Sequence, residues 1–348
     1  MEGKTRPMTR PDIQSLDDAR RVLGHLPEAD GAAAQAAAEQ ESRLTKPEGS
    51  LGRLEELCLW LCRWQGRHPP TMKTPKAQIF AGNHGIAKQG VSAYPADVTA
   101  QMVANFESGG AAINQLCQAF GVGFAIDALS LDRPTRDFTA APAMSEEECA
   151  EAFVFGIGTV TDGTDVLCLG EMGIGNTTAA ATLSLALYGG DAGDWTGAGT
   201  GVSGPALAKK INLVETAADF HGPALADPLE ALRCVGGREL AAIAGAVLAA
   251  RFRRVPVMLD GYVATAAAAV LEAACPGALD HCQVGHVSTE PGHRRLLEKL
   301  GKKPILDLHM RLGEATGAVL AVQVLRAATA CHTGMATFAD AGISGKSG

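Results

Sequence analysis

DVLCLGEMGIGNTTAAATLSLAL, residues 165–187, is the stretch of sequence that decides the fold. Its apolar run DVLCLG (165–170) leads into the glycine-rich segment GEMGIGNTT (170–178), which is followed by an Ala-rich run of helical character. This order predicts a strand, a tight turn and a helix. Glycines let a phosphate approach the backbone, and the first N–H groups of a helix donate to it. A turn without a ligand is equally compatible, since the segment is neither a Walker motif nor a GxGxxG motif.

Similar apolar runs recur along the chain and alternate with longer helical patterns. They are AQIFAG (77–82), VGFAID (122–127), VPVMLDG (255–261) and PILDLHM (304–310). This alternation is typical of parallel strands with crossover helices. We therefore predict an α/β fold with a mostly parallel, Rossmann-like sheet and flanking helices, in which ligands bind beyond the carboxyl ends of the strands. A helix is expected from Ser50, and the chain returns to helix over 311–338.

Composition narrows the class of protein. The 348 residues are 47% hydrophobic and 20% charged, with a net charge of −8. Basic residues do not cluster with aromatics, so nucleic acid is not an expected partner. No run of 18 apolar residues and no apolar signal region is present, which predicts neither a membrane span nor export. The nine cysteines form no CxxC pair, which favours a reducing, cytoplasmic location. Cys58 and Cys62, four residues apart in a helical run, are interpreted as core residues.

Two further glycine-rich segments are candidates for binding a phosphorylated ligand. TGAGTG (196–201) is followed by Lys209 and Lys210, which can reach a phosphate or simply cover a helix surface. VGHVSTEPGH (284–293) offers Ser288 and Thr289, which can bind phosphate oxygens or cap the next helix. Its two histidines are only a weak indication of a metal site.

Two other segments contain candidate proton acceptors. His84 follows the first apolar run and is interpreted as a residue that orients a loop, with general-base catalysis as the alternative. Glu314 precedes an apolar helix, where a carboxylate is stabilised as an anion. In a water-poor pocket its pKa would instead rise, as a general base requires. Composition does not decide between these two roles.

Taken together, these segments resemble the nicotinate-nucleotide–dimethylbenzimidazole phosphoribosyltransferase family. The resemblance spans most of the chain from about residue 46, in the family's order. The matching stretches are KPEGSLGRLE (46–55), FAGNHGIAKQGVSAYPADVTAQMVANFESGGAAIN (80–114), GEMGIGNTTAAA (170–181), TGAGTGV (196–202), VGGREL (235–240), LDGYVATAAA (259–268), GHVSTEPGH (285–293) and LDLHMRLGEATGA (306–318).

The resemblance implies an activity in the assembly of the lower-ligand nucleotide of cobalamin. Nicotinate mononucleotide and 5,6-dimethylbenzimidazole would give α-ribazole 5′-phosphate and nicotinate, with inversion at the anomeric carbon. Glu314 matches the family's general base. The nicotinate nitrogen is already cationic, so its departure needs no acid, and the resemblance implies no metal and no cofactor.

The resemblance also implies residue roles and an assembly. Glu171 and Lys210 would support catalysis, while other residues would bind the phosphoribosyl group (Gly173, Asn176, Thr177, Gly199, Ser288) or the benzimidazole (Tyr94, Met102, Met172, Leu312). A large domain (70–310), a small helical domain from both chain ends (1–69 with 311–348) and a homodimer are expected.

The chain departs from the family's pattern at Asn83, Ala198 and Gly285, where Asp, Arg or a larger residue, and Ser are common. These departures leave the preferred acceptor base open, and adenine or a phenol are alternatives to the benzimidazole. A non-catalytic nucleotide sensor on the same fold would be expected to lack Glu314, Glu171 and Lys210, which are all present. A pyrophosphate donor is disfavoured, because no apolar run ends in paired acidic residues before a Thr/Ser-Gly loop.

Overall fold

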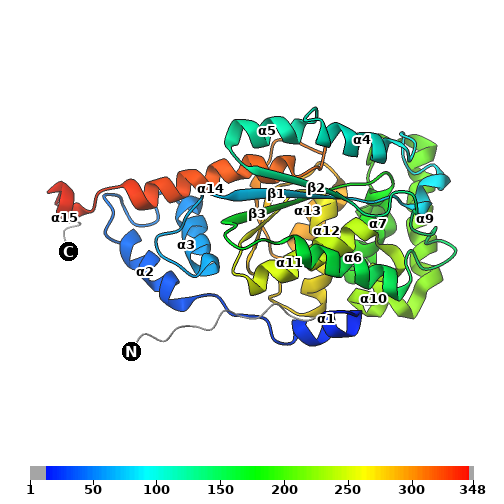
Figure 1. Ribbon diagram of the computed structural model, residues 1–348, viewed down its shortest axis with the longest axis horizontal. Helices are drawn as coiled ribbons and strands as arrows, with labels where there is room; N and C mark the ends of the chain where they lie inside the picture. Colours follow the sequence, from blue (N-terminus) through cyan, green and yellow to red (C-terminus); the bar gives the residue numbers. More distant parts are fainter. Residues whose placement is uncertain (1–12, 345–348) are drawn as a thin grey trace.

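A six-stranded sheet organises the described part of the chain, and all of its strands are parallel, in agreement with the mostly parallel sheet that was predicted (Figure 1). The computed structural model describes residues 13–344. The strand order is β2-β1-β3-β4-β5-β6. The strands are β1 (Pro75–Ala81), β2 (Gly123–Ala128), β3 (Val166–Met172), β4 (Val257–Leu259), β5 (Cys282–His286) and β6 (Pro304–Leu306).

One strand was not predicted from the sequence. β5 has the sequence CQVGH, in which only Cys282 and Val284 are apolar and both are fully buried. The apolar run that signals a buried strand is interrupted by Gln283, Gly285 and His286. The strand is also too short for its alternation of apolar and other residues to stand out in the sequence. The last expected strand also ends earlier, at Leu306, so the segment 307–315 is free to form a loop.

Side chains of alternate strand residues enter two hydrophobic clusters, one on each face of the sheet. In β3, Leu167 and Leu169 belong to the first cluster, whereas Val166 and Cys168 belong to the second. This alternation is the two-residue period of a strand buried on both faces. Helices that contribute to the first cluster are α1 (Leu16–Leu23), α6 (Glu146–Thr159), α7 (Asn176–Tyr188), α8 (Ala192–Trp195), α9 (Gly204–His221), α10 (Pro228–Val235), α11 (Arg238–Phe252), α12 (Tyr262–Ala274) and α13 (Pro291–Lys299).

The second face is covered by helices from both ends of the chain. The terminal helices are α2 (Gly31–Glu41), α3 (Arg53–Gln65) and α14 (Thr316–Gly334), and α4 (Val98–Glu107) and α5 (Ala112–Phe120) complete the layer. Figure 1 shows α14 running from the sheet to an outer end where α2, α3 and α15 (Phe338–Ala341) lie. Side chains of α3 share one hydrophobic cluster with side chains of β1 and β3. The N-terminal helix α1 does not join α2 and α3 but packs on α6 and α12. The division into two domains therefore stays a prediction, because the terminal helices share a core with the sheet.

No helix within residues 13–344 has the length and apolarity needed to cross a membrane.

The N-terminal turn of α14 is pressed against the carboxyl ends of the central strands. A Cβ on Gly170 would lie 2.1 Å from the backbone nitrogen of Ala315, and one on Gly285 would lie 2.6 Å from the Cα of Ala318. Asp260, which follows β4, accepts a hydrogen bond from the backbone N–H of Ala318 at 2.9 Å. The departure at Gly285 thus has a physical reason in this chain, since a serine side chain would overlap the helix backbone.

We predict that Gly170→Ala lowers the free energy of unfolding by roughly 1–3 kcal/mol or more, because the new methyl group would overpack the contact between β3 and α14. Thermal unfolding followed by circular dichroism would measure the loss. Gly193→Ala is the matched control, because a Cβ there meets nothing within 4 Å. Equal melting temperatures for Gly170→Ala and the control would contradict the close approach.

Candidate active site

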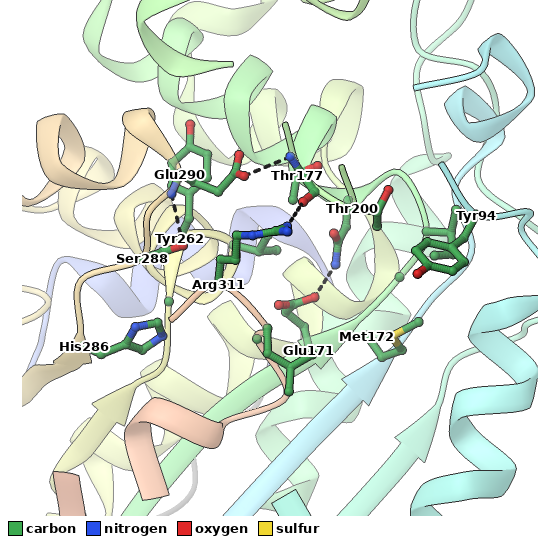
Figure 2. Close-up of a pocket in the computed structure, with 18 residues that line it drawn as sticks. Tyr94, Glu171, Met172, Thr177, Thr200, Tyr262, His286, Ser288, Glu290 and Arg311 are labelled. Atoms are coloured by element: carbon green, nitrogen blue, oxygen red, sulfur yellow. Dashed lines mark hydrogen bonds between the residues drawn. The ribbon is translucent and has the colours of Figure 1, made fainter. Parts of the chain in front are cut away.

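A cavity of about 490 Å³ opens beyond the carboxyl ends of β3, β4 and β5, where the fold places ligand sites (Figure 2). Nine residues expected from the sequence line it: Tyr94, Glu171, Met172, Gly173, Asn176, Thr177, Gly199, Ser288 and Leu312. Lys210, Met102 and Glu314 do not. Several lining residues were missed, among them Thr200, Tyr262, His286, Glu290 and Arg311.

The first glycine-rich segment forms the turn between β3 and α7. Gly175 has a φ of 99° and precedes α7, so the helix begins at Asn176 with its first turn beside the cavity. The Asn176 and Thr178 N–H groups donate to the carbonyl oxygens of Gly173 and Gly175 at 3.1 and 3.0 Å, which tightens this turn. A Cβ on Gly173 would lie 2.7 Å from the carbonyl oxygen of Gly82, which explains the need for glycine in this turn. Asn176 Nδ2 donates a short hydrogen bond to Glu171 Oε2 and fixes that carboxyl at the cavity wall.

Lys210 supports the second glycine-rich segment from behind. Its side chain is fully buried, whereas Lys209 is exposed. Lys210 Nζ donates to Thr177 Oγ1 at 2.8 Å and to the carbonyl oxygen of Gly197 at 3.0 Å. Desolvation lowers the pKa of Lys210 to about 8, against the opposing effect of the Glu290 carboxylate. The lysine thus connects the loop to α7, and its ammonium group lies behind Thr177, which lines the cavity.

The second and third glycine-rich segments meet the segment before α14 at Gly199. The backbone N–H of Gly199 donates to Glu290 Oε1 at 2.8 Å, and its carbonyl accepts from Arg311 Nη1 at 2.8 Å. Figure 2 shows Glu290, Arg311, Thr177 and Ser288 around the same part of the cavity. Ser288 does not cap α13, whose N-cap is Glu290; its Oγ accepts from the Glu290 N–H at 3.3 Å. Its hydroxyl lines the cavity.

Glu314 lies directly next to the cavity, in a strained turn. Gly313 lines the cavity, and Gly313, Glu314 and Ala315 have φ values of 83°, 63° and 61°. Two successive non-glycine residues in this region cost roughly 1–3 kcal/mol each, and such strain is concentrated at functional sites. The residue is 4% exposed, and no donor among residues 13–344 forms a hydrogen bond with its carboxyl group. Burial, together with the nearby Asp260 carboxylate, raises the pKa of Glu314 to about 7.

Other carboxyl groups make this end of the cavity strongly acidic. Burial raises the pKa of Glu171 to about 8, with further contributions from the charges of Glu239, Asp260 and Glu314. Burial also raises the pKa of Asp260 to about 6, against the opposing effect of His286. His286 Nε2 is 3.6 Å from Asp260 Oδ1. The Glu171 carboxyl is therefore mostly protonated near neutral pH, whereas Glu314 and Asp260 have pKa values at which they can accept a proton from a ligand.

The remaining histidine candidates have structural partners. His84 Nε2 forms a short contact with Glu239 Oε1, and both side chains are fully buried, in agreement with the orienting interpretation of His84. Both ring nitrogens of His293 are engaged, Nδ1 by the Ser288 N–H at 2.9 Å and Nε2 by Thr265 Oγ1 at 3.1 Å. His293 therefore has no free nitrogen for the metal site considered above.

Two departures from the family's pattern can be located. Asn83 Nδ2 donates to the carbonyl oxygen of Leu131 at 2.9 Å, which an aspartate in this place could not do when ionised. The carbonyl oxygen of Ala198 accepts hydrogen bonds from the N–H groups of Gly201 and Val202 at 2.9 and 3.0 Å.

Met102, which was expected to contact the benzimidazole, lies on α4 and is half-buried against the second hydrophobic cluster.

Comparison with known proteins identifies the family of the chain. A family model described as Phosphoribosyltransferase matches residues 26–343. The nicotinate-nucleotide–dimethylbenzimidazole phosphoribosyltransferase of Rhizobium meliloti (strain 1021) is 59% identical over 331 residues, covering 95% of this chain and 98% of the relative. The protein of that name from Sinorhizobium medicae (strain WSM419) is 58% identical with the same coverage. The crystal structure of CobT from Thermus thermophilus has a TM-score of 0.85 at 40% identity, over 90% of this chain and 100% of that one.

The fold and site thus define an enzyme of the phosphoribosyltransferase class, a pentosyltransferase. Within this class, the chain belongs to the nicotinate-nucleotide–dimethylbenzimidazole phosphoribosyltransferase family, as the resemblance predicted.

The raised pKa of Glu314 predicts how the free energy of unfolding changes with pH. The folded protein keeps this carboxyl protonated at pH values where the unfolded chain, with a pKa near 4.5, has lost the proton. The wild-type protein therefore loses stability as the pH rises from about 4.5 to 7, by up to about 1.4 kcal/mol per pKa unit. Glu314→Gln removes this loss and should raise the melting temperature more at pH 8 than at pH 5.

Calorimetry at both pH values would test this, with Glu215→Gln as the control, since Glu215 is an exposed residue of α9. A pH-independent effect of Glu314→Gln would show that the carboxyl is not held protonated by the fold.

Proposed function

We propose that the enzyme transfers the phosphoribosyl group of nicotinate mononucleotide to 5,6-dimethylbenzimidazole, giving α-ribazole 5′-phosphate and nicotinate, with Glu314 as the general base. The relatives' names supply the substrates. The observation that supports the mechanism is the Glu314 carboxyl, which is buried beside the cavity, has no hydrogen-bond donor among the described residues and has a pKa of about 7. Such a group accepts a proton efficiently near neutral pH.

The phosphate of the nucleotide would bind where the three glycine-rich segments meet. The Thr177 N–H in the first turn of α7, next to Asn176, and the hydroxyl of Ser288 would supply donors there. Gly173 and Gly199 allow the close approach. Arg311 lines the same cavity, and buried Lys210 holds Thr177 in position, so both add positive charge.

The acceptor base would occupy the apolar part of the cavity. Met172 directly follows Glu171, and Leu312 stands two residues before Glu314. Tyr94 contributes an aromatic ring at the opening, where it is 57% exposed. A flat heterocycle fits a slot of this kind. Met102, set back on α4, would act through its packing at this end of the cavity, and its role as a direct contact is the least supported of the four.

The reaction needs one proton acceptor and no acid. Glu314 takes the proton from one nitrogen of the benzimidazole while the other nitrogen attacks the anomeric carbon. The bond between this carbon and the nicotinate nitrogen breaks, and its electron pair neutralises the cationic ring. Attack on the face opposite the leaving group converts the β-linkage to α. Glu171, hydrogen-bonded to Asn176, would position the reactants, and its acidic neighbours favour the cationic nucleotide ring.

Two alternatives to this function are transfer to another acceptor and nucleotide binding without catalysis. Adenine or a phenol would use the same base and phosphate loops, so only the apolar part of the cavity distinguishes these acceptors. A nucleotide sensor would bind nicotinate mononucleotide without turnover. The presence of Glu314, Glu171 and Lys210 at or beside the cavity favours an enzyme over a sensor, which would have no need of a proton acceptor.

We expect Glu314→Gln to reduce kcat by about 10²–10⁴ with a small change in the KM for nicotinate mononucleotide, because it removes a proton acceptor without reshaping the phosphate site. Product would be followed by chromatography and its anomeric configuration read by NMR, in parallel with Glu215→Gln. Wild-type activity on adenine or a phenol, but not on dimethylbenzimidazole, would reassign the acceptor. Nucleotide binding without any product would support the sensor, and equal rates for the variant would remove Glu314 from its role.

We also propose that the enzyme is a cytoplasmic homodimer. Tyr94 and Leu312, both at the cavity and more than half exposed, are apolar surface that a second subunit could cover. All nine cysteines are free thiols, which suits a reducing compartment. Light scattering on the purified protein should give twice the chain mass of 35.9 kDa. A monomer mass at micromolar concentration would overturn the dimer.

A further inference from the structure

A cluster of soft ligand groups lies at the outer end of α14, away from the cavity. Cys58 and Cys62 on α3 and His332 in the last turn of α14 are all buried. Their two sulfur atoms and a ring nitrogen of His332 lie within 4.8 Å of one another. Within residues 13–344, no other three His, Cys, Asp or Glu side chains meet in this way. From Thr316 to His332 the helix rises roughly 24 Å, so the cluster is separate from the active site.

A second histidine, His68 in the loop that follows α3, contacts His332 at the edge of the cluster. It does not lie within 4.8 Å of all three ligand atoms, so it would have to move towards the sulfur atoms to complete a ligand set. His68 Nε2 is 3.0 Å from His332 Nε2, and the two rings meet edge to face at 85°. Two imidazole nitrogens that bind one tetrahedral zinc ion are roughly 3.3 Å apart, given bonds of about 2.0 Å. The pair is therefore already spaced as zinc ligands are. Two cysteines and two histidines are a common ligand set of structural zinc sites.

The surroundings of His332 also suit a metal ligand. Its Nδ1 is hydrogen-bonded to Glu41 Oε2, which leaves Nε2 with a free lone pair when the proton is on Nδ1. A carboxylate behind a ligating histidine fixes the tautomer and the ring orientation. Glu41 is itself held by Lys46, at 3.2 Å, and Lys46 also pairs with Glu55 at 2.7 Å.

Core packing, the interpretation made from the sequence, accounts for two buried cysteines but not for this arrangement. Cys117 and Cys168 are equally buried in the same hydrophobic cluster and belong to no such group of ligand atoms within residues 13–344. Cys58 and Cys62 are one helical turn apart, so their side chains point the same way, towards His332. Two thiolates would also balance the charge of a divalent ion.

We propose that Cys58, Cys62, His332 and His68 bind one zinc ion, which ties α3 and the loop before β1 to the end of α14. The site is structural: four protein ligands leave no position for a substrate. It joins His68 to His332, which is 264 residues further along the chain.

The full-length protein, purified and then loaded with Zn²⁺ and desalted, should retain about one zinc per chain by mass spectrometry of the elements. Co²⁺ loaded in its place should give thiolate charge-transfer absorption and the visible bands of a tetrahedral site. Stripping zinc with a chelator should lower the melting temperature by several degrees, since a ligand at about 1,000 times its Kd stabilises by about 4 kcal/mol. None of these measurements requires a variant to fold.

Variants then assign the ligands. Cys58→Ala, Cys62→Ala and His332→Ala should each weaken zinc binding at least tenfold, whereas Cys117→Ala, the matched buried cysteine, should retain zinc. His68→Ala should weaken binding and open a coordination position, which shifts the Co²⁺ spectrum. Less than about 0.1 zinc per chain after loading, absence of the Co²⁺ bands, or equal losses in Cys117→Ala would overturn the proposal.

Discussion

The structure depends on the contact between the first turn of α14 and the carboxyl ends of β3, β4 and β5. Gly170 and Gly285 remove the side chains that would prevent it, and the Asp260 carboxylate accepts the Ala318 N–H at its centre. The contact closes one face of the sheet and forces the preceding residues into a left-handed turn. Glu314 is the second residue of this turn. A packing constraint of the core therefore determines where the candidate base lies and how little water reaches it.

The same constraint explains the electrostatics of the site. Asp260 is fully buried because it caps the helix, and its charge adds to the burial that raises the pKa of Glu314 to about 7. The Glu171 carboxyl is affected in turn by both groups. At the other end of the cavity, Arg311 and Lys210 accompany the helix N-terminus of α7. The cavity is thus polarised, with donors and positive charge for a phosphate at one end and proton acceptors at the other, as transfer from an anionic nucleotide to a neutral heterocycle requires.

Much of the fold could be predicted because β1, β3 and β4 lie in largely apolar runs that end at glycine or aspartate. β5 could not, since its burial depends on Gly285 and His286 fitting against α14, which is a tertiary contact without a local pattern. In the site, the glycine-rich segments were found from composition, and Glu314 from the resemblance. Glu290 and Arg311 were missed because each acts through Gly199, 91 and 112 residues away along the chain. Nor does the sequence distinguish buried Lys210 from exposed Lys209, as only the register of α9 on α7 separates them.

Because α14 is a continuous helix, its two ends are not independent. A slip of one residue along the helix axis would move the first turn by about 1.5 Å, enough to misplace a proton acceptor that must lie within hydrogen-bond reach of its substrate. Close glycine contacts oppose such a slip at the sheet. At the outer end, His332 is held between Glu41 and His68, beside the cysteines of α3. A zinc ion there would fix the helix at its far end as well, so that helices from both chain ends set the position of the catalytic turn.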